Sequence, residues 1–213
     1  MSGLSARYDE LVAAPEQAAA VDRLARLQSE LEREPARPGL LGRLFGAAPV
    51  PQPRGIYMWG GVGRGKSMLM DLFHDTLAIA DKRRAHFHAF MQDGHALLRE
   101  ERAKKLGDPI PPVAARLAEG VRRAVFAWGM TPYAIMSRLF RALMVDLGVT
   151  VVTTSNRPPD DLYKDGLNRE HFLPFIALVK ERLDVQRLNG PVDYRLERMA
   201  GLDTWHCPLG VEA

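Results

Sequence analysis

The chain has 213 residues, 46% of them hydrophobic, and its 29 basic and 26 acidic residues give a formal net charge of +3 at pH 7. This hydrophobic content suffices for one globular domain with a proper core, and the interleaved charges give little support to a nucleic-acid or membrane-surface partner. The single cysteine, Cys207, excludes an intrachain disulfide and is typical of a reducing compartment.

The first residues are not expected to form a secretory signal. MSGLSARYDELVAAPEQ contains acidic residues early and has no apolar run, unlike a secretory signal. No window reaches the roughly 18 consecutive apolar residues of a membrane-spanning helix. We therefore expect a cytoplasmic protein without a membrane span.

Three regions are expected along the chain. Residues 1–34 form an N-terminal helical segment, in which Val21, Leu24 and Leu27 recur at helical spacing within a helix over 8–34. Residues 35–53 are rich in proline and glycine, which predicts a linker. Residues 54–213 form the main domain.

Strands and helices alternate in the main domain. The predicted strands cover 55–60, 85–90, 121–128 and 150–155, and the predicted helices cover 66–78, 92–105, 134–147 and 168–182. LDVQRL and VDYRL flank Asn189-Gly190, which predicts a C-terminal β-hairpin. The alternation favours an α/β fold with a parallel sheet covered by helices on both faces.

Residues 60–67, GGVGRGKS, match the phosphate-binding pattern G-x-x-x-x-G-K-[ST]. Glycines let the backbone curl so that successive N–H groups point inward, and the following helix adds the positive end of its dipole. Lys66 would neutralise the β- and γ-phosphates of a nucleoside triphosphate, and the Ser67 hydroxyl would ligate Mg²⁺. The motif follows a predicted strand and opens a predicted helix, as this chemistry requires.

The candidate nucleotide-binding residues are Gly60, Gly61, Val62, Gly63, Arg64, Gly65, Lys66, Ser67 and Met68. ATP with Mg²⁺ is the expected ligand, with Ser67 as the metal-binding residue. The side chains of Met68, Met70 and Phe73 are expected in the core rather than in a partner groove.

Three segments of the chain resemble the AFG-like ATPase family. They are GIYMWGGVGRGKSMLMDLF at 55–73, HFHAFM at 86–91 and TSNRPPDDLYKDGLNREHFLPFI at 154–176. The resemblance extends over most of residues 8–210 and implies an AAA+-type P-loop core. The family's bacterial member is a cytoplasmic ATPase associated with the division-ring protein FtsZ. The resemblance therefore implies ATP, Mg²⁺, protein partners such as FtsZ, and a homo-oligomer.

Two further catalytic candidates rest on the same resemblance. Asn156 closes the strand TVVTTSN, where the family has a polar sensor residue, and an amide there would orient the attacking water. Its alternative role is a loop cap before Pro158. Arg169 would act on a neighbouring subunit as an arginine finger, and its alternative is a surface helix residue. With Lys66, these residues form the predicted catalytic set.

The chain departs from the family where two acidic Walker B residues are expected. Ala124 and Val125 stand near those positions, and no acidic residue occurs between Glu119 and Asp146. Nucleotide binding would survive this loss, whereas hydrolysis would fall severely. The chain also ends at TWHCPLGVEA, short of the family's usual C-terminal portion. Both a degenerate relative and a damaged reading frame are compatible with these departures.

Three functions are compatible with the sequence. The first is an ATPase that couples ATP binding and hydrolysis to action on protein partners in cell division. The second is a nucleotide-binding adaptor that hydrolyses little ATP. The third is a P-loop small-molecule kinase, against which the long resemblance at 154–176 counts.

Overall fold

The computed structural model describes residues 4, 6–8, 17–33, 52–105, 107–119, 124–128, 134–166 and 168–188. Within these ranges five strands form a parallel sheet in the order β2-β3-β4-β1-β5. The strands are β1 (Gly55–Trp59), β2 (Lys82–His86), β3 (Ala124–Trp128), β4 (Thr150–Ser155) and β5 (Leu183–Arg187). The helices are α2 (Ala18–Glu32), α4 (Lys66–Thr76), α5 (Phe87–Ala103), α6 (Ile110–Leu117), α7 (Ala134–Arg141) and α8 (Leu173–Arg182).

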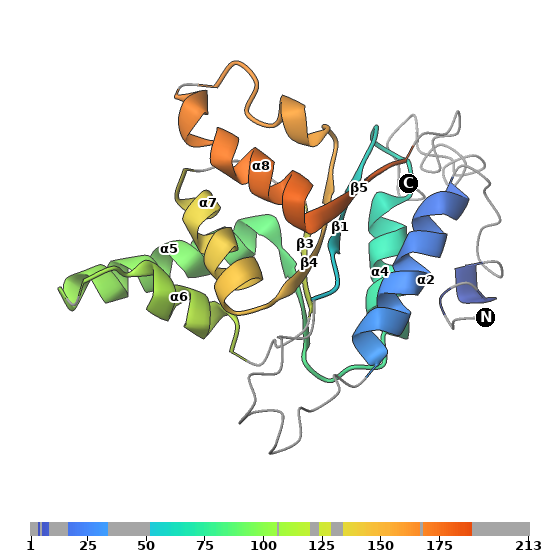
Figure 1. Ribbon diagram of the computed structural model, residues 1–213, viewed down its shortest axis with the longest axis horizontal. Coiled ribbons are helices and arrows are strands. Elements are labelled where there is room, and N and C mark those ends of the chain that lie inside the picture. Colours follow the sequence, from blue (N-terminus) through green and yellow to red (C-terminus); the bar gives the residue numbers. More distant parts are fainter. Residues whose placement is uncertain are drawn as a thin grey trace, which may run out of the picture.

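The sheet lies between two layers of helices (Figure 1). Helices α2 and α4 cover one face, and α5, α6, α7 and α8 cover the other. Each face therefore has its own hydrophobic core, as a parallel sheet buried on both sides requires. The predicted α/β fold with a sheet covered on both faces is confirmed.

Strand β1 lies inside the sheet, between β4 and β5, and is apolar on both faces. Ile56 and Met58 are fully buried in the core formed with α2 and α4, whereas Tyr57 is fully buried in the core on the other face. Successive side chains of a strand point to opposite faces, so these three residues contact both helical layers. Strand β1 accordingly pairs on both sides, with β4 and with β5.

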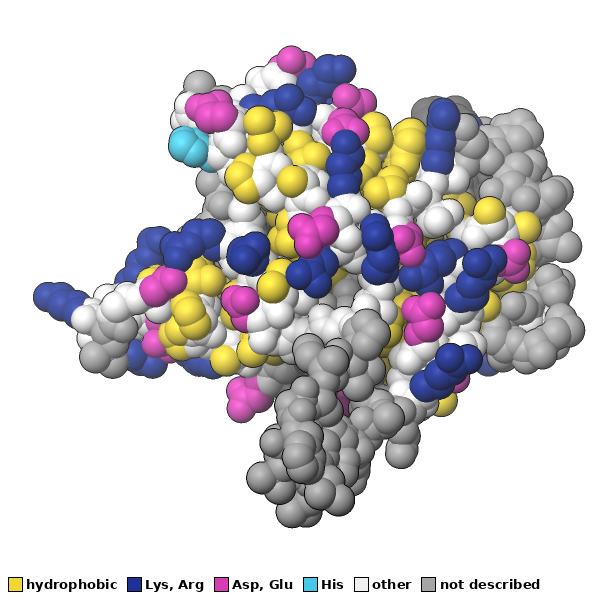
Figure 2. All heavy atoms as spheres, viewed as in Figure 1, with side chains coloured by type: hydrophobic (Ala, Val, Ile, Leu, Met, Phe, Trp, Pro, Cys, Tyr) yellow, Lys and Arg dark blue, Asp and Glu magenta, His cyan; other side chains and the backbone are white. Residues whose placement is uncertain are grey.

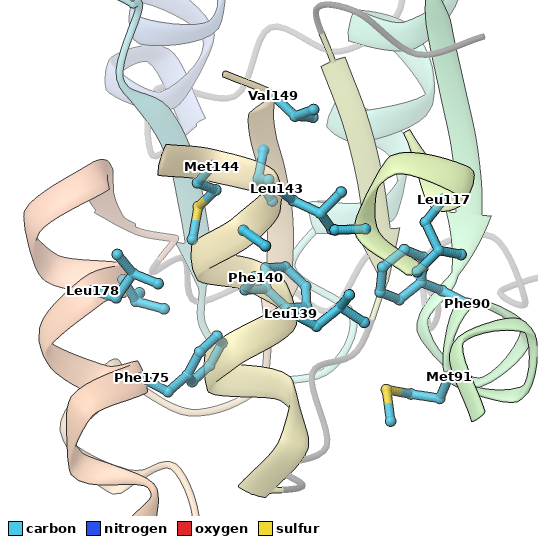
Figure 3. Packing of buried hydrophobic residues seen from close by; sticks show 14 of the residues in the cluster. Phe90, Met91, Leu117, Leu139, Phe140, Leu143, Met144, Val149, Phe175 and Leu178 are labelled. Carbon is cyan, nitrogen blue, oxygen red and sulfur yellow. The ribbon is translucent and has the colours of Figure 1, made fainter. Parts of the chain in front are cut away.

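The larger core lies between the sheet and helices α5–α8, and Phe140 of α7 occupies its centre (Figure 3). The Phe140 ring lies 5.8 Å from that of Phe90 on α5 and 5.4 Å from that of Phe175 on α8, centroid to centroid. Both pairs meet edge to face, the geometry that the aromatic quadrupole favours. One side chain thus links three helices that cover the same face of the sheet.

Most predicted elements are confirmed, but the strand predicted over 85–90 is wrong. Strand β2 covers Lys82–His86, and the apolar stretch after it begins helix α5. The reason is that Phe90 and Met91 recur with Leu98 at helical spacing and pack into the Phe140 core. The charged residues before them form β2, a strand at the edge of the sheet.

Two other predicted helices have shorter or modified boundaries. The predicted helix over 134–147 is α7 followed by a π-helical segment, Ala142–Asp146. In the predicted helix over 168–182, Arg169–His171 form a 3₁₀ turn ahead of α8.

The first arm of the predicted C-terminal hairpin is β5, which pairs in parallel with β1 at the edge of the sheet. The turn at Asn189-Gly190 and the second arm lie outside the described residues. So do residues 34–51, which include most of the predicted linker over 35–53.

The N-terminal segment packs on the main domain through α2. Its buried residues Val21, Leu24, Leu27 and Leu31 belong to the same core as Ile56 of β1. A partly exposed ion pair adds to the attachment, because Arg23 Nε lies 2.6 Å from Asp184 Oδ2 on β5. Helix α2 is therefore a structural part of the layer that also contains α4.

None of the helices in the described part of the chain is both long and apolar enough to cross a bilayer. Figure 2 shows basic and acidic side chains interleaved over the visible face. The described surface in this view thus has the mixed charge pattern that the composition predicts.

The Phe140 core generates a stability prediction. Phe140→Ala removes a fully buried ring that contacts two other rings, so the free energy of unfolding should fall by about 3–5 kcal/mol. Leu173→Ala is the control, because Leu173 is 48% exposed and its loss should cost less than about 0.5 kcal/mol. Urea unfolding followed by circular dichroism measures both changes, and equal losses in the two variants would contradict this packing.

Candidate functional site

The candidate site lies at the carboxyl ends of β1 and β4. These strands are neighbours, yet the helices that follow them, α4 and α8, cover opposite faces of the sheet. In open α/β sheets, ligands bind at such a switch point, outside the carboxyl ends of the strands. The structure brings Gly60 and Asn156 to this place, because Gly60 N–H donates to the carbonyl of Ser155 at 3.3 Å.

The loop between β1 and α4 depends on its glycines. Gly63 and Gly65 both have φ of +76°, a conformation that other residues adopt only with strain. Gly65 is the N-cap of α4, which begins at Lys66. The N–H groups in the first turn of a helix cannot pair within the helix, which makes a helix N-terminus a suitable place for an anion.

Gly60 is required for a different reason, close approach of the backbone. A Cβ at this position would overlap the carbonyl oxygen of Leu188, the residue that follows β5. The same residue donates its N–H to the carbonyl of Trp59 at 2.7 Å, which extends the β1–β5 pairing to the start of the loop. The entrance of the loop is thereby fixed between β4 and β5.

Lys66 is buried and closes the loop on itself. Its Nζ donates to the carbonyl oxygens of Gly60, at 2.8 Å, and Gly61, at 2.6 Å. Phosphate oxygens are stronger acceptors for an ammonium group than neutral carbonyls are. A phosphate in the loop would therefore attract Nζ away from these carbonyls at little cost.

The remaining candidate residues of the loop differ in exposure. Val62 is 49% exposed at the loop surface, and Arg64 is half-buried. Ser67 is exposed in the first turn of α4, while Met68 is half-buried and packs against the α2–α4 core. Met70 and Phe73 are fully buried, so the prediction of core side chains on α4 is confirmed for these two.

Tyr57 supports the loop that carries Asn156. Its hydroxyl donates to the carbonyl of Arg157 at 2.9 Å, and Arg157 N–H donates to Ser155 Oγ at 3.1 Å. Burial raises the pKa of Tyr57 to about 12, and a side-chain hydrogen bond with Ser155 opposes this rise. Asn156 itself is exposed at the end of β4.

The carboxylates expected from the family would be needed at the end of β3 nearest the phosphate loop, and the register of β3 shows which residues stand there. Ala124 and Val125 begin β3, and Ala124 pairs with Thr150, the first residue of β4. They therefore lie at the end of β3 that is far from the phosphate loop. At the end near the loop, β3 stops at Trp128, which pairs with Thr154. No residue of β3 is acidic, so this end lacks a carboxylate from β3.

Arg169 lies in the connection between β4 and α8, at the start of a 3₁₀ turn. It is half-buried, and its guanidinium donates to the carbonyl of Asp160 at 2.5 Å. Asp160 is also tied to α8, because its Oδ1 lies 2.6 Å from Lys180 Nζ. The single chain thus holds Arg169 against its own β4–α8 connection.

Sequence reasoning missed two residues that contact the phosphate loop or its support. Gln17 donates from Nε2 to the carbonyl of Arg64 at 2.9 Å, and Tyr8 Oη donates to Gln17 Oε1 at 2.9 Å. A glutamine directly before an amphipathic helix is the only signal in the sequence. It could not be placed beside residue 64 without the fold.

The donor set fits the phosphates of a nucleoside triphosphate. Backbone N–H groups at a helix N-terminus and a buried lysine converge on one loop of residues 60–67. For Mg²⁺, Ser67 offers a hydroxyl but β3 offers no carboxylate. Among the described residues no group of three or more His, Cys, Asp or Glu gathers into a metal site.

The buried phenol of Tyr57 generates a pH prediction. The pKa of the Tyr57 phenol is about 12 in the folded chain, against an ordinary value of 10.0. Between pH 10 and pH 12 ionisation of this phenol therefore favours the unfolded chain. The stability contribution is present below pH 10 and is lost as the pH rises toward 12. Unfolding free energy should fall more steeply over this range in the wild-type chain than in Tyr57→Phe. Parallel slopes would contradict the burial of this hydroxyl.

The comparisons with known proteins agree with this geometry. Residues 5–213 match the AFG1-like ATPase family. The chain is 38% identical over 207 residues to the cell division protein ZapE of Escherichia coli K12, covering 89% of this chain and 54% of that protein. It is 39% identical over 160 residues to lactation elevated protein 1 homolog B of Danio rerio, covering 69% and 32%. The chain thus spans about half, or less, of the length of these relatives.

Solved structures show the same fold at low sequence identity. Domain III of the replication initiation protein DnaA from Thermotoga maritima has a TM-score of 0.56 at 15% identity, covering 87% of this chain and 67% of that one. DnaI has a TM-score of 0.53 at 14% identity, covering 86% and 87%. At these identities the two structures show that the chain shares their fold. With the family match over nearly its whole length, the chain belongs to the AFG1-like ATPase family.

Proposed function

We propose that this chain binds ATP with Mg²⁺ at residues 60–67 and uses ATP binding and hydrolysis to act on protein partners in cell division. The observation that carries the proposal is the buried Lys66, held by the carbonyls of a glycine loop at the β1–β4 switch point. A cation buried against neutral carbonyls in an anion-binding loop is poised for phosphates.

Each candidate residue has a defined task in this proposal. Gly60 fixes the entrance of the loop, the N–H groups from Gly61 to Met68 hold the phosphates, Lys66 neutralises their charge, and Ser67 binds the metal. Mg²⁺ would supply charge neutralisation across the β- and γ-phosphate oxygens. Asn156, beside the loop at the end of β4, orients the attacking water. Arg169 serves a neighbouring subunit of a homo-oligomer after it leaves the Asp160 carbonyl.

The partner is proposed from the family. The E. coli relative is named a cell division protein, and an interaction with the division-ring protein FtsZ is the specific form of the proposal. A cytoplasmic location belongs to the same proposal and is supported by the single cysteine. The charged, mixed surface in Figure 2 is compatible with a protein partner.

A nucleotide-binding adaptor is the second candidate, and the end of β3 favours it. Because β3 ends in Ala127 and Trp128, it supplies no carboxylate to polarise water or to hold Mg²⁺. Such a chain would bind ATP and change shape with little turnover. The family match counts against the third alternative, a small-molecule kinase.

Lys66→Ala tests nucleotide binding. Removing the ammonium should weaken ATP at least about tenfold, because charge-assisted hydrogen bonds to phosphate are lost. Lys82→Ala is the matched control, since Lys82 Nζ also donates to two backbone carbonyls, those of His74 and Leu77, at the other end of α4. Calorimetric titration with Mg²⁺–ATP should show the loss in the first variant alone.

The same preparations distinguish the ATPase from the adaptor. Turnover of about 0.1 s⁻¹ or faster that disappears in Lys66→Ala would establish a working ATPase and exclude the adaptor. Binding through Lys66 without turnover would support the adaptor.

The register of β3 predicts where carboxylates would restore hydrolysis. The double change Ala127→Asp and Trp128→Glu puts two carboxylates at the end near the loop, and turnover should rise at least about tenfold above the unmodified chain. Ala124→Asp with Val125→Glu is the control, because it adds the same charges at the far end of the strand. If both variants melt cooperatively and the control has the higher turnover, the strand register in solution is different.

A further inference from the structure

We propose that Gln17 is a positioning residue for the phosphate loop: it fixes the Arg64–Gly65 peptide so that the Gly65 N–H is directed toward the phosphates. Gln17 immediately precedes α2 and is only 2% exposed. The inference rests on the proposed binding of ATP at residues 60–67 and adds a residue that neither the motif nor the family match assigns.

The orientation of one peptide plane carries the proposal. Gln17 Nε2 donates to the carbonyl oxygen of Arg64 at 2.9 Å. In a planar trans peptide the C=O and the following N–H point in opposite directions. A bond that holds the Arg64 carbonyl toward Gln17 therefore directs the Gly65 N–H away from Gln17, to the side where the phosphates are proposed to bind. Without this bond the peptide is freer to rotate, because glycine at 65 tolerates many conformations.

The space beside Gly65 shows that the contact is built into the loop. A Cβ at Gly65 would overlap Gln17 Nε2, so the amide occupies the place of the missing side chain. Gly65 also has φ of +76°. This glycine is thus demanded twice, by the backbone turn and by the amide packed against it.

Tyr8 fixes which end of the Gln17 amide meets the loop. Its hydroxyl donates to Gln17 Oε1 at 2.9 Å, which leaves Nε2 directed at Arg64. Tyr8 is 4% exposed, and both it and Leu4 belong to the core that contains α2 and α4. Tyr8 is therefore coupled to the phosphate loop through Gln17, by one buried and one partly buried hydrogen bond.

A second glutamine on α2 provides a matched control within the same molecule. Gln28 is 4% exposed, and its Nε2 donates to the carbonyl of Thr76, at the C-terminal end of α4, at 2.9 Å. Gln17 and Gln28 thus hold opposite ends of α4 by the same kind of bond. Only Gln17 is at the end that faces the phosphates, so only its loss should change ligand affinity.

The test compares Gln17→Met with Gln28→Met in the full chain. Methionine keeps the length of the side chain, adds no charge and cannot donate. Affinities for Mg²⁺–ATP and for inorganic tripolyphosphate are measured by competition against a fluorescent ATP analogue, with thermal melting alongside. Gln17→Met should weaken both ligands about fivefold to tenfold, while Gln28→Met stays within about twofold of wild type despite a similar loss of melting temperature.

Tyr8→Phe is the milder variant, because it removes only the hydroxyl that orients the amide, and it should weaken both ligands about twofold to threefold. It decides the question alone if Gln17→Met does not fold. Wild-type affinity in Gln17→Met, or in Tyr8→Phe in that case, would overturn the inference. Weaker ATP with unchanged tripolyphosphate would also overturn it, since Gln17 would then act on the nucleoside. A wild-type chain that binds neither ligand would refute the proposed function as well.

Discussion

A loop that offers its N–H groups to an anion cannot use them to hold itself together. Its shape has to come from its neighbours, and the structure supplies a contact at each end. Leu188 and Ser155 fix the entrance at Gly60, from the two strands on either side of β1. Gln17 fixes the exit at Arg64, from the layer that contains α2. These contacts hold the loop from outside, in a shape that suits the proposed phosphate site.

The order of the sheet separates the residues proposed for nucleotide binding from the strand proposed to serve hydrolysis. The phosphate loop depends on β1, its two neighbouring strands and α4, all of which are intact. The family resemblance implies that hydrolysis also needs carboxylates from β3, the strand beyond β4, and β3 has none. Loss of acidic residues in β3 leaves Gly60, Gly65 and Lys66 undisturbed. The proposed nucleotide binding therefore does not depend on carboxylates in β3.

The sequence predicted the features that depend on local pattern. The strand before residue 60, the loop at 60–67 and the β-branched strand β4 follow from apolar runs and glycine spacing. The predicted strand over 85–90 failed because the same apolar residues satisfy a helical spacing, and only packing against Phe140 decides between the two. Contacts between distant segments were not predictable. Gln17 meets Arg64, and Tyr57 meets Arg157, only because the sheet brings these segments together.

Amide hydrogen exchange with and without Mg²⁺–ATP tests the central claim most directly, that residues 60–67 hold the phosphates with backbone N–H groups. Peptides covering this loop and the first turn of α4 should exchange at least about tenfold more slowly with ATP, because bound N–H groups are protected. Peptides covering β2, at the edge of the sheet away from the loop, should not change. Unchanged exchange in residues 60–68 at saturating ATP would contradict the phosphate site.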